Sequence, residues 1–389
     1  MAKRSKNSHS NAGAVCGTLL FFALLALGAW WAWNRSQGKA LQLPEWAVFW
    51  KKELPVTNSP VRVQTAKESE PHTSENASLP RTNPPVRVTN SSPSAELVEH
   101  ESKQFRNVRN ALDAQIALAR KGISVGPIDG SGGVNMRRAL LAWQVHNNLS
   151  VSGDLDQESK GVLLVEEPLF IQYTVSDSDL RRIMKIPATW LGKSQVEKLD
   201  YESLLELVAE KGRTSMEFIK KLNPEINWTN VNPGALVKMP RIDPPPVLER
   251  AAFVRVHLYT KTLDVFSKST NLIAHYPCSI AARVEKRPVG TLHVAKAAAN
   301  PTYLFDPEVF SESPEARKIG RKLSIPPGPN NPVGTAWIGL DRPGYGIHGT
   351  PKPESVGRTE SHGCFRLANW NAEHFLQLAW VGLPVIVEE

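Results

Sequence analysis

The stretch from Tyr345 to Leu367 reads YGIHGTPKPESVGRTESHGCFRL and holds one cysteine and two histidines among glycines. Twelve residues separate His348 from Ser361 in this stretch. At its ordinary pKa of ~8.5 a thiol is only a few per cent ionised at neutral pH, so a nucleophilic cysteine needs a nearby imidazole to accept its proton. Cys364 with a histidine close by meets this requirement, and we expect the pair to carry out acyl transfer.

The second histidine and the glycine before the cysteine leave several interpretations open. Gly363 frees the backbone to aim successive NH groups at an oxygen, as stabilisation of an oxyanion requires. His348 is the better candidate for the base, and His362 has the alternative role of a hydrogen-bonding loop residue. A metal site of His348, His362 and Cys364 is conceivable in ligand type, but the sequence offers neither a fourth ligand nor an acidic residue patterned to support the histidines.

The sequence around these clusters predicts a mainly β unit. Alternating or apolar runs that predict strands lie at 254–258, 263–266, 272–276, 290–295, 336–340, 346–348 and 385–387, and a single helix is predicted at 371–380. The first three runs follow one another closely, which indicates an antiparallel meander. We therefore expect a β-sandwich or a β-barrel over residues 250–389.

These residues and their spacing resemble the signature of a known family. A histidine followed downstream by Ser/Thr-His-Gly-Cys is the signature of the L,D-transpeptidase catalytic domain of bacterial cell-wall enzymes, and residues 361–367 match it throughout. Residues 288–291 and 300–303 resemble two further motifs of that family, and Asn369 stands where an asparagine is usual. Two positions depart from the pattern: Arg287 replaces a threonine, and Asn371 stands where an aspartate is common.

The resemblance implies a role for each residue of the motif. Cys364 would be the nucleophile and His348 the general base, oriented by the backbone carbonyl of Gly349. His362, Gly363 and Cys364 would present NH groups to the oxyanion, and Arg366 would support the loop or bind a substrate carboxylate. No cofactor and no metal are implied.

The implied reaction is a cross-link between peptidoglycan stem peptides. The thiolate attacks the carbonyl of the third residue of a tetrapeptide stem and expels D-alanine, and the amine of a neighbouring stem then attacks the thioester. Water as acceptor would give an L,D-carboxypeptidase, and a lipoprotein lysine would give attachment of that lipoprotein to the wall. The alternative that is not an enzyme is a non-catalytic wall tether. Carbapenems acylate the cysteine of this family, so acylation of Cys364 by a carbapenem would distinguish an enzyme from a tether.

Two smaller segments precede this unit. Residues 105–167 show helical spacing around glycine and Asp-Gly turns and a Trp143-Gln144 pair, and they resemble a three-helix peptidoglycan-binding domain. Residues 172–241 resemble a lysin motif, a β-α-α-β binder of peptidoglycan glycans, although residues 183–201 intervene where that family places its first helix. The turn and core residues of these segments also have a purely structural interpretation, in which they cap helices and fill a core and do not contact peptidoglycan.

The amino-terminal hundred residues predict a membrane tether. Residues 13–33 carry no charge, and as a helix they span about 31 Å, enough for one transmembrane helix between a cytoplasmic tail at 1–12 and a Pro/Ser/Thr-rich linker at 34–104. A signal peptide is the weaker interpretation, because the apolar run is long and ends in tryptophans. The chemistry then predicts a single-pass inner-membrane protein with its catalytic domain in the periplasm or extracytoplasmic space.

Composition narrows the partners further. Lys and Arg number 46 against 38 Asp and Glu, a net charge of +8 spread along the 389 residues. Without an arginine-rich arm, this modest excess favours an anionic wall polymer over nucleic acid. For the basic run at 317–322 a solvated face is the preferred interpretation.

Cys16, Cys278 and Cys364 lie too far apart for a zinc ribbon or a disulfide scaffold, and we expect Cys278 to be a buried small hydrophobic residue. The sequence does not predict an oligomeric state.

Overall fold

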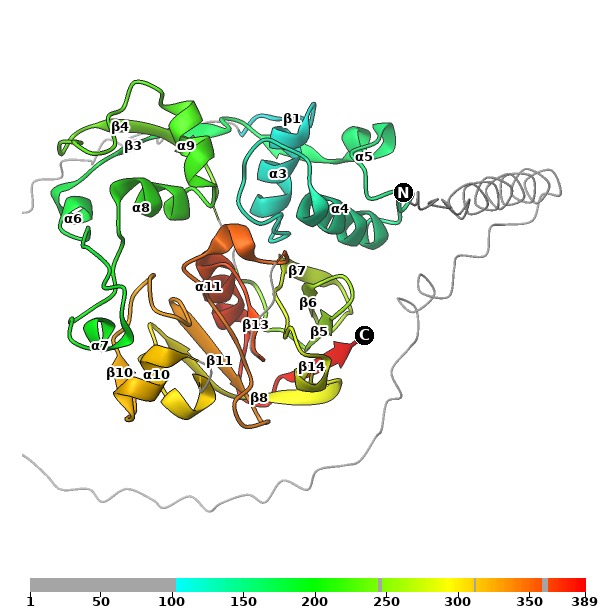
Figure 1. Cartoon of the computed structure of the whole chain (residues 1–389). Helices are drawn as coiled ribbons and strands as arrows, with labels where there is room; N and C mark the ends of the chain where they lie inside the picture. The colour runs from blue at the N-terminus through cyan, green and yellow to red at the C-terminus, as the bar shows by residue number, and fades with distance from the viewer. Residues whose placement is uncertain (1–102, 244–246, 311–312, 359–362) are drawn as a thin grey trace, which may run out of the picture. The chain divides into compact units, whose positions relative to one another are not determined.

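A computed structural model describes residues 103–243, 247–310, 313–358 and 363–389 (Figure 1). All of them belong to one compact unit, Ala95–Glu389. The predicted tail, the predicted membrane span at 13–33 and nearly all of the linker lie outside the described residues. Within the part that is described, every helix is too short or too polar to cross a bilayer.

Eight strands in the last third of the chain form one sheet. Its order is β13-β12-β11-β8-β14-β5-β6-β7, with β12/β13 and β14/β5 parallel and the other pairs antiparallel. The bounds are β5 Phe253–His257, β6 Thr262–Phe266, β7 Leu272–Pro277, β8 Gly290–Ala299, β11 Ala336–Leu340, β12 Gly346–His348, β13 Phe365–Arg366 and β14 Pro384–Glu388. Every strand predicted in this region is present, and the predicted meander is the antiparallel trio β5-β6-β7.

The sheet curls until its two ends meet. Directly after β7, Ser279 donates its backbone NH to the Arg366 carbonyl at 2.9 Å, and the Arg366 NH donates back to the Ser279 carbonyl at 2.9 Å. Because Arg366 lies in β13, these two bonds join the first strand of the sheet order to the last. Of the two expected architectures, the eight-stranded sheet is therefore barrel-like, and not a sandwich of two stacked sheets.

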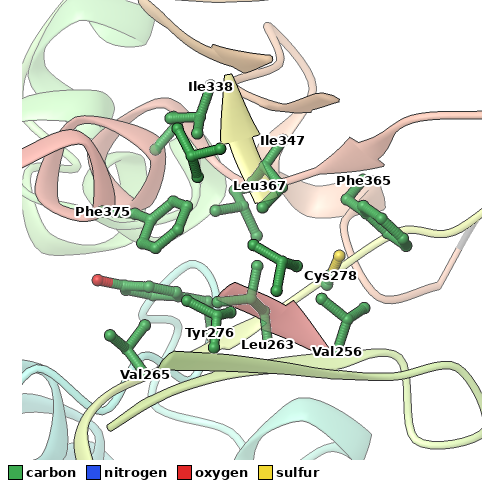
Figure 2. Close-up of a cluster of buried hydrophobic side chains, with 14 of the residues drawn as sticks. Val256, Leu263, Val265, Tyr276, Cys278, Ile338, Ile347, Phe365, Leu367 and Phe375 are labelled. Atoms are coloured by element: carbon green, nitrogen blue, oxygen red, sulfur yellow. The ribbon is translucent and has the colours of Figure 1, made fainter. Parts of the chain in front are cut away.

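The interior of this curled sheet is apolar. Figure 2 shows side chains of β5, β6 and β7 facing those of β11, β12 and the segment around β13. The Cys278 side chain is fully buried among them and burial raises the pKa of its thiol, so the expectation of a small hydrophobic role is confirmed. Helix α11 (Asn369–Leu378) covers the cluster with Phe375, at the position where the sequence predicts a helix.

A second helix in this region, α10 (Pro314–Ile319), corrects the expectation of a single one. Ser313 caps its first turn, Pro314 begins it, and Gly320 ends it at a φ of 61°. With six residues it is too short to show a helical period in the sequence. It carries Arg317 and Lys318 of the basic run and lies near the hairpin of β9 (Tyr303–Phe305) and β10 (Leu323–Ile325).

The segment that resembles a peptidoglycan-binding domain has its three predicted helices. They are α3 (Ala111–Arg120), α4 (Val134–His146) and α5 (Gln157–Val162), closed by a ribbon of β1 (Phe105–Asn107) and β2 (Leu164–Glu166). The buried Gln144 accepts from the Gly153 NH at 2.7 Å, and Gln115 accepts from the Gly130 NH at 2.8 Å. The two glutamine side chains hold the two turns, which is a structural role for Gln144 of the Trp143-Gln144 pair.

The segment from 170 to 240 has the order β-α-α-α-α-β, so two additional short helices interrupt the expected β-α-α-β order. β3 (Phe170–Thr174) pairs antiparallel with β4 (Leu236–Pro240), and α8 (Leu204–Lys211) and α9 (Met216–Leu222) lie between them in the chain. Two short helices, α6 (Asp177–Leu180) and α7 (Trp190–Lys193), occupy the stretch before α8. Trp190 of α7 stacks on Phe305 of β9, with ring centroids 4.3 Å apart. The intervening residues 183–201 therefore reach the C-terminal unit.

Backbone hydrogen bonds join the three segments to one another. The Ser124 NH donates to the His275 carbonyl at 2.8 Å, and the Ile128 NH donates to the Arg213 carbonyl at 2.9 Å. The Leu199 NH donates to the Pro327 carbonyl at 2.9 Å. Each segment thus contributes to a shared framework around the C-terminal sheet.

Candidate active site

The predicted site residues lie at the ends of two paired strands. In the parallel pair β12/β13, Ile347 lies opposite Phe365 and His348 lies opposite Arg366. Cys364 comes directly before β13, so the register places its backbone beside Gly346. Two clusters that are separated in the sequence therefore meet side by side at the end of the curled sheet.

The alternation of side chains puts the reactive groups on one face. Ile347 and Phe365 are buried in the apolar interior. Successive side chains of a strand point to opposite faces, so His348 and Arg366 face away from that interior, and Cys364 shares their side. Because Cys364 lies opposite Gly346, His348 is its diagonal neighbour across the pair, a relation in which Cα atoms lie about 7–8 Å apart and both side chains extend from the same face.

His348 is held in a fixed orientation. Its Nδ1 lies 2.7 Å from the carbonyl oxygen of Gly349, which makes Nδ1 the protonated nitrogen and leaves Nε2 as the basic one. The ring stacks on the indole of Trp337, with centroids 5.5 Å apart and planes inclined at 22°. The side chain is 5% exposed, and burial lowers its pKa to about 4, with the Arg366 charge adding to the effect. The imidazole is therefore neutral at pH 7 and able to accept a proton.

Cys364 is partly buried and protonated at rest. Its Sγ–H donates to the Gly344 carbonyl oxygen over 3.5 Å. Burial raises the pKa of the thiol, against the opposing effects of a backbone hydrogen bond from Gly346 and of the Arg366 charge. A raised thiol pKa and a lowered imidazole pKa together describe a neutral pair, so the proton has to transfer as the sulfur attacks.

Two charged or polar groups complete the surroundings of the sulfur. Arg366 is half-buried, and burial lowers its pKa against the opposing influence of Cys278 and Cys364. Its positive charge stabilises a thiolate on Cys364 and destabilises an imidazolium on His348. It therefore assists removal of the proton from the sulfur only as negative charge develops there. Burial raises the pKa of Tyr303 to about 12, with the charge of Cys364 contributing, so this hydroxyl stays protonated near the nucleophile.

The carbonyl that orients His348 is itself fixed by close packing. A Cβ on Gly349 would lie within 3.0 Å of Asn369 Oδ1, and a Cβ on Gly334 would meet the same oxygen. Gly334 also has a φ of 64°, which a glycine adopts without strain. The Asn369 amide is fully buried, and its Oδ1 accepts from the Thr335 NH at 3.3 Å. The loop that carries the Gly349 carbonyl is thus anchored to the start of α11.

Some predicted site residues lie outside this geometry. His362 and Ser361 are not among the described residues, so the NH of His362 and the metal alternative that needs its ring stay predictions. Gly363 is described, and a Cβ built on it meets no described atom within 4 Å, so packing in that part of the chain does not demand glycine there. Within the described ranges, no three His, Cys, Asp or Glu side chains gather closely enough to hold a metal ion.

The two departures from the family pattern have structural roles. Arg287 donates from Nε to the Ala281 carbonyl at 3.0 Å and so holds the loop after β7. Asn371 is buried and donates from Nδ2 to Ser124 Oγ at 2.9 Å, a contact with the 105–167 segment. The hydrogen bonds of both side chains thus go to other parts of the fold, the loop after β7 and the 105–167 segment.

Sequence reasoning missed Trp337 and Tyr303 as parts of the site. Tyr303 lies in the motif at 300–303, which signalled its family position but not the influence of Cys364 on its pKa. Trp337 gave no such signal, because its contact with His348 depends on the register of β11 against β12. A Cβ on Gly346 would lie 2.6 Å from the Trp337 ring, so that glycine makes room for the indole that covers His348.

Comparison with known proteins supports the C-terminal assignment. A family model described as the L,D-transpeptidase catalytic domain matches residues 251–387, and one described as "Putative peptidoglycan binding domain" matches residues 109–163. The chain is 26% identical over 165 residues to "Putative L,D-transpeptidase YkuD" of Bacillus licheniformis, covering 42% of this chain and 81% of that protein. It is 37% identical over 108 residues to "Putative L,D-transpeptidase YqjB" of Bacillus subtilis, covering 26% and 52%.

A solved L,D-transpeptidase from Mycobacterium smegmatis is similar at 19% identity with a TM-score of 0.29, covering 41% of this chain and 76% of that one. The family-model and curated matches identify residues 251–387 as an L,D-transpeptidase catalytic domain. These matches support a transpeptidase enzyme.

Proposed function

We propose that this transpeptidase cross-links peptidoglycan stem peptides through a thioester on Cys364. The observation that carries the proposal is the pairing of β12 with β13, which brings the Cys364 thiol to the same sheet face as a neutral, oriented His348. A nucleophile, a base and a group that orients the base are the parts that covalent acyl transfer requires.

The first half-reaction forms the acyl-enzyme. His348 Nε2 takes the Cys364 proton while the sulfur attacks the carbonyl carbon of the third residue of a donor tetrapeptide. The carbon–nitrogen bond to the terminal D-alanine then breaks, and the imidazolium returns the proton to the leaving amine. The backbone NH groups of His362, Gly363 and Cys364 stabilise the oxyanion in this scheme, and Arg366 favours charge on the sulfur or binds a substrate carboxylate.

The second half-reaction transfers the acyl group. The side-chain amine of a neighbouring stem attacks the thioester, His348 accepts the proton of that amine, and the Cys364 sulfur leaves and is reprotonated. An amide bond replaces the thioester, so the cross-link forms without an external energy source. With water as acceptor the same steps give an L,D-carboxypeptidase, and with a lipoprotein lysine they give a wall-attached lipoprotein.

We also propose that the rest of the chain keeps the enzyme at the wall. The match of residues 109–163 to a peptidoglycan-binding model supports contacts with glycan strands. The paired strands β3 and β4, with α8 and α9 between them in the chain, support such contacts for a lysin-motif-like segment. The uncharged run at 13–33 supports a single inner-membrane span with the catalytic domain on the outer side. For the cytoplasmic tail, the membrane span, the linker and the three folded modules, we propose the residue bounds that the sequence predicts.

The proposal is tested by incubating the purified full chain with tetrapeptide-rich sacculi and analysing the released muropeptides by mass spectrometry. Dimers joined between two third-position residues are the expected product, and Cys364→Ala should yield none. Tripeptide monomers without dimers would point to the carboxypeptidase instead. Unchanged sacculi with an enzyme that is folded would contradict both and leave the wall tether.

A further inference from the structure

The Asn369 amide is held by groups on both of its sides. Its Oδ1 accepts from the Thr335 NH at 3.3 Å, and its Nδ2 donates to the Pro329 carbonyl at 3.1 Å. The Nδ2 group also donates to both carboxyl oxygens of Glu210, at 3.1 and 3.3 Å. A flipped amide would face its oxygen toward acceptors and its NH₂ toward a donor, so these partners select one orientation.

Glu210 comes from another part of the chain. It lies in the last turn of α8, in the 170–240 segment and 159 residues before Asn369. The Tyr201 hydroxyl donates to its Oε1 at 3.2 Å. Burial raises the pKa of the Glu210 carboxyl to about 8, and Glu373 and Glu206 add to the shift. Burying a carboxyl in this way is costly, and a contact that only joined two segments could use a less costly group.

The position of Glu210 relative to the C-terminal unit is fixed by neighbouring contacts. The Leu199 NH and carbonyl bond to Pro327 and Asn330, at 2.9 and 3.0 Å. Asn330 Nδ2 also donates to Glu206 Oε1 at 2.7 Å, one helical turn before Glu210 on the same helix. The carboxyl therefore reaches Asn369 from a helix that is docked at several other points.

We propose that Glu210 is a positioning residue for acyl transfer: its carboxyl orients the Asn369 amide, which fixes the Gly349 carbonyl that orients His348. Asn369 Oδ1 lies so close to Gly349 that a Cβ there would overlap it, and the Gly349 carbonyl is 2.7 Å from His348 Nδ1. A segment resembling a wall-binding module thus contributes to the geometry of the active site. The inference rests on the proposed roles of Cys364 and His348.

The test is the single-turnover acylation of the full chain by imipenem, followed by mass spectrometry, with maximal rate and apparent Kd measured separately. Acylation of the wild type and none in Cys364→Ala establish Cys364 as the acylated nucleophile before any Glu210 variant is judged. Glu210→Met removes the acceptor at similar length. It should lower the maximal rate roughly 10- to 100-fold, the scale of a small misplacement of a catalytic group, with Kd changed less than about twofold.

Three further variants separate positioning from general docking. Glu210→Gln keeps an acceptor oxygen and should stay within about threefold of the wild-type rate, whereas Glu210→Asp shortens the reach and should lose rate like the methionine variant. Glu206→Ala removes a contact of the same helix with the same unit and should keep the wild-type rate. Near-UV circular dichroism confirms that each variant is folded.

The proposal is overturned by a folded Glu210→Met with a wild-type rate, or by equal losses in Glu210→Met and Glu206→Ala. If Glu210→Met does not fold, the Gln and Asp variants decide. Equal rates for those two, whether high or low, overturn the positioning role, and a high rate for Gln with a low rate for Asp supports it.

Discussion

The rate at which Cys364 is alkylated should depend steeply on pH. Burial raises the pKa of this thiol above its ordinary value, and the pKa of His348 lies at about 4. The thiol is therefore mostly protonated at neutral pH, and its small thiolate fraction rises roughly tenfold for each pH unit. Because only the thiolate reacts, the rate with iodoacetamide should rise roughly 70- to 100-fold between pH 6 and pH 8.

The perturbation that sharpens this test is His348→Gln. A neutral resting pair means that His348 does not create the thiolate at equilibrium, so the alkylation profile of the variant should nearly match the wild type. Acylation by imipenem needs the base during attack and should fall about 10²- to 10⁴-fold in the same variant. The two reagents thus separate resting ionisation from proton transfer in the reaction.

The assay follows the mass of the intact chain over time, with Cys364→Ala run in parallel to subtract alkylation of Cys16 and Cys278. An alkylation rate that is level from about pH 5 to pH 9 would refute the reasoning, because it would reveal a thiolate–imidazolium ion pair. A large drop in alkylation at pH 7 in His348→Gln would refute it as well.

Three further outcomes follow from the same groups. In Gly346→Ala the new Cβ would lie 2.6 Å from the Trp337 ring, so unfolding free energy should fall by about 1–3 kcal/mol and tryptophan fluorescence should shift; an unchanged urea midpoint would contradict this. The pKa of His348 in the folded protein lies below its ordinary 6.5, so its contribution to stability is present above pH 6.5 and is lost as pH falls toward 4. Urea titrations should show that the free energy of unfolding falls by up to about 3 kcal/mol over this range, and that His348→Gln reduces this loss. An equal loss in the variant would refute the assignment. The pKa of Glu210 in the folded protein is raised from 4.5 to about 8, so its effect on stability is most favourable below pH 4.5 and declines as pH rises to 8. The free energy of unfolding of Glu210→Gln, relative to the wild type, should therefore be higher at pH 8 than at pH 5, by less than about 5 kcal/mol. No difference between the two pH values would contradict the raised pKa.

The local parts of the C-terminal fold could be predicted from the sequence. Strands β11 and β12 lie at their expected positions, because apolar residues and flanking glycines mark them without help from distant residues. The clusters at 345–350 and 361–367 likewise predicted that Cys364 lies near a histidine, because ionisation of the thiol needs a nearby imidazole. Of that second cluster the structure describes 363–367 only.

The long-range parts could not be predicted. Closure of the sheet depends on two backbone bonds between Ser279 and Arg366, and backbone groups leave no trace in the residue types. The contact of Glu210 with Asn369 spans 159 residues, and an exposed helix position would equally well hold a glutamate. The intervening residues 183–201 were visible as a departure from the lysin motif, but their packing on β9 depends on tertiary contacts that have no local pattern.

The central claim, that Cys364 carries the acyl group, is tested most directly by peptide mapping after exposure of the folded full chain to imipenem. The account predicts one added imipenem per wild-type chain, on the peptide that contains Cys364, and no adduct in Cys364→Ala. An adduct that persists in Cys364→Ala, or a folded wild-type chain that gains no mass, would contradict it.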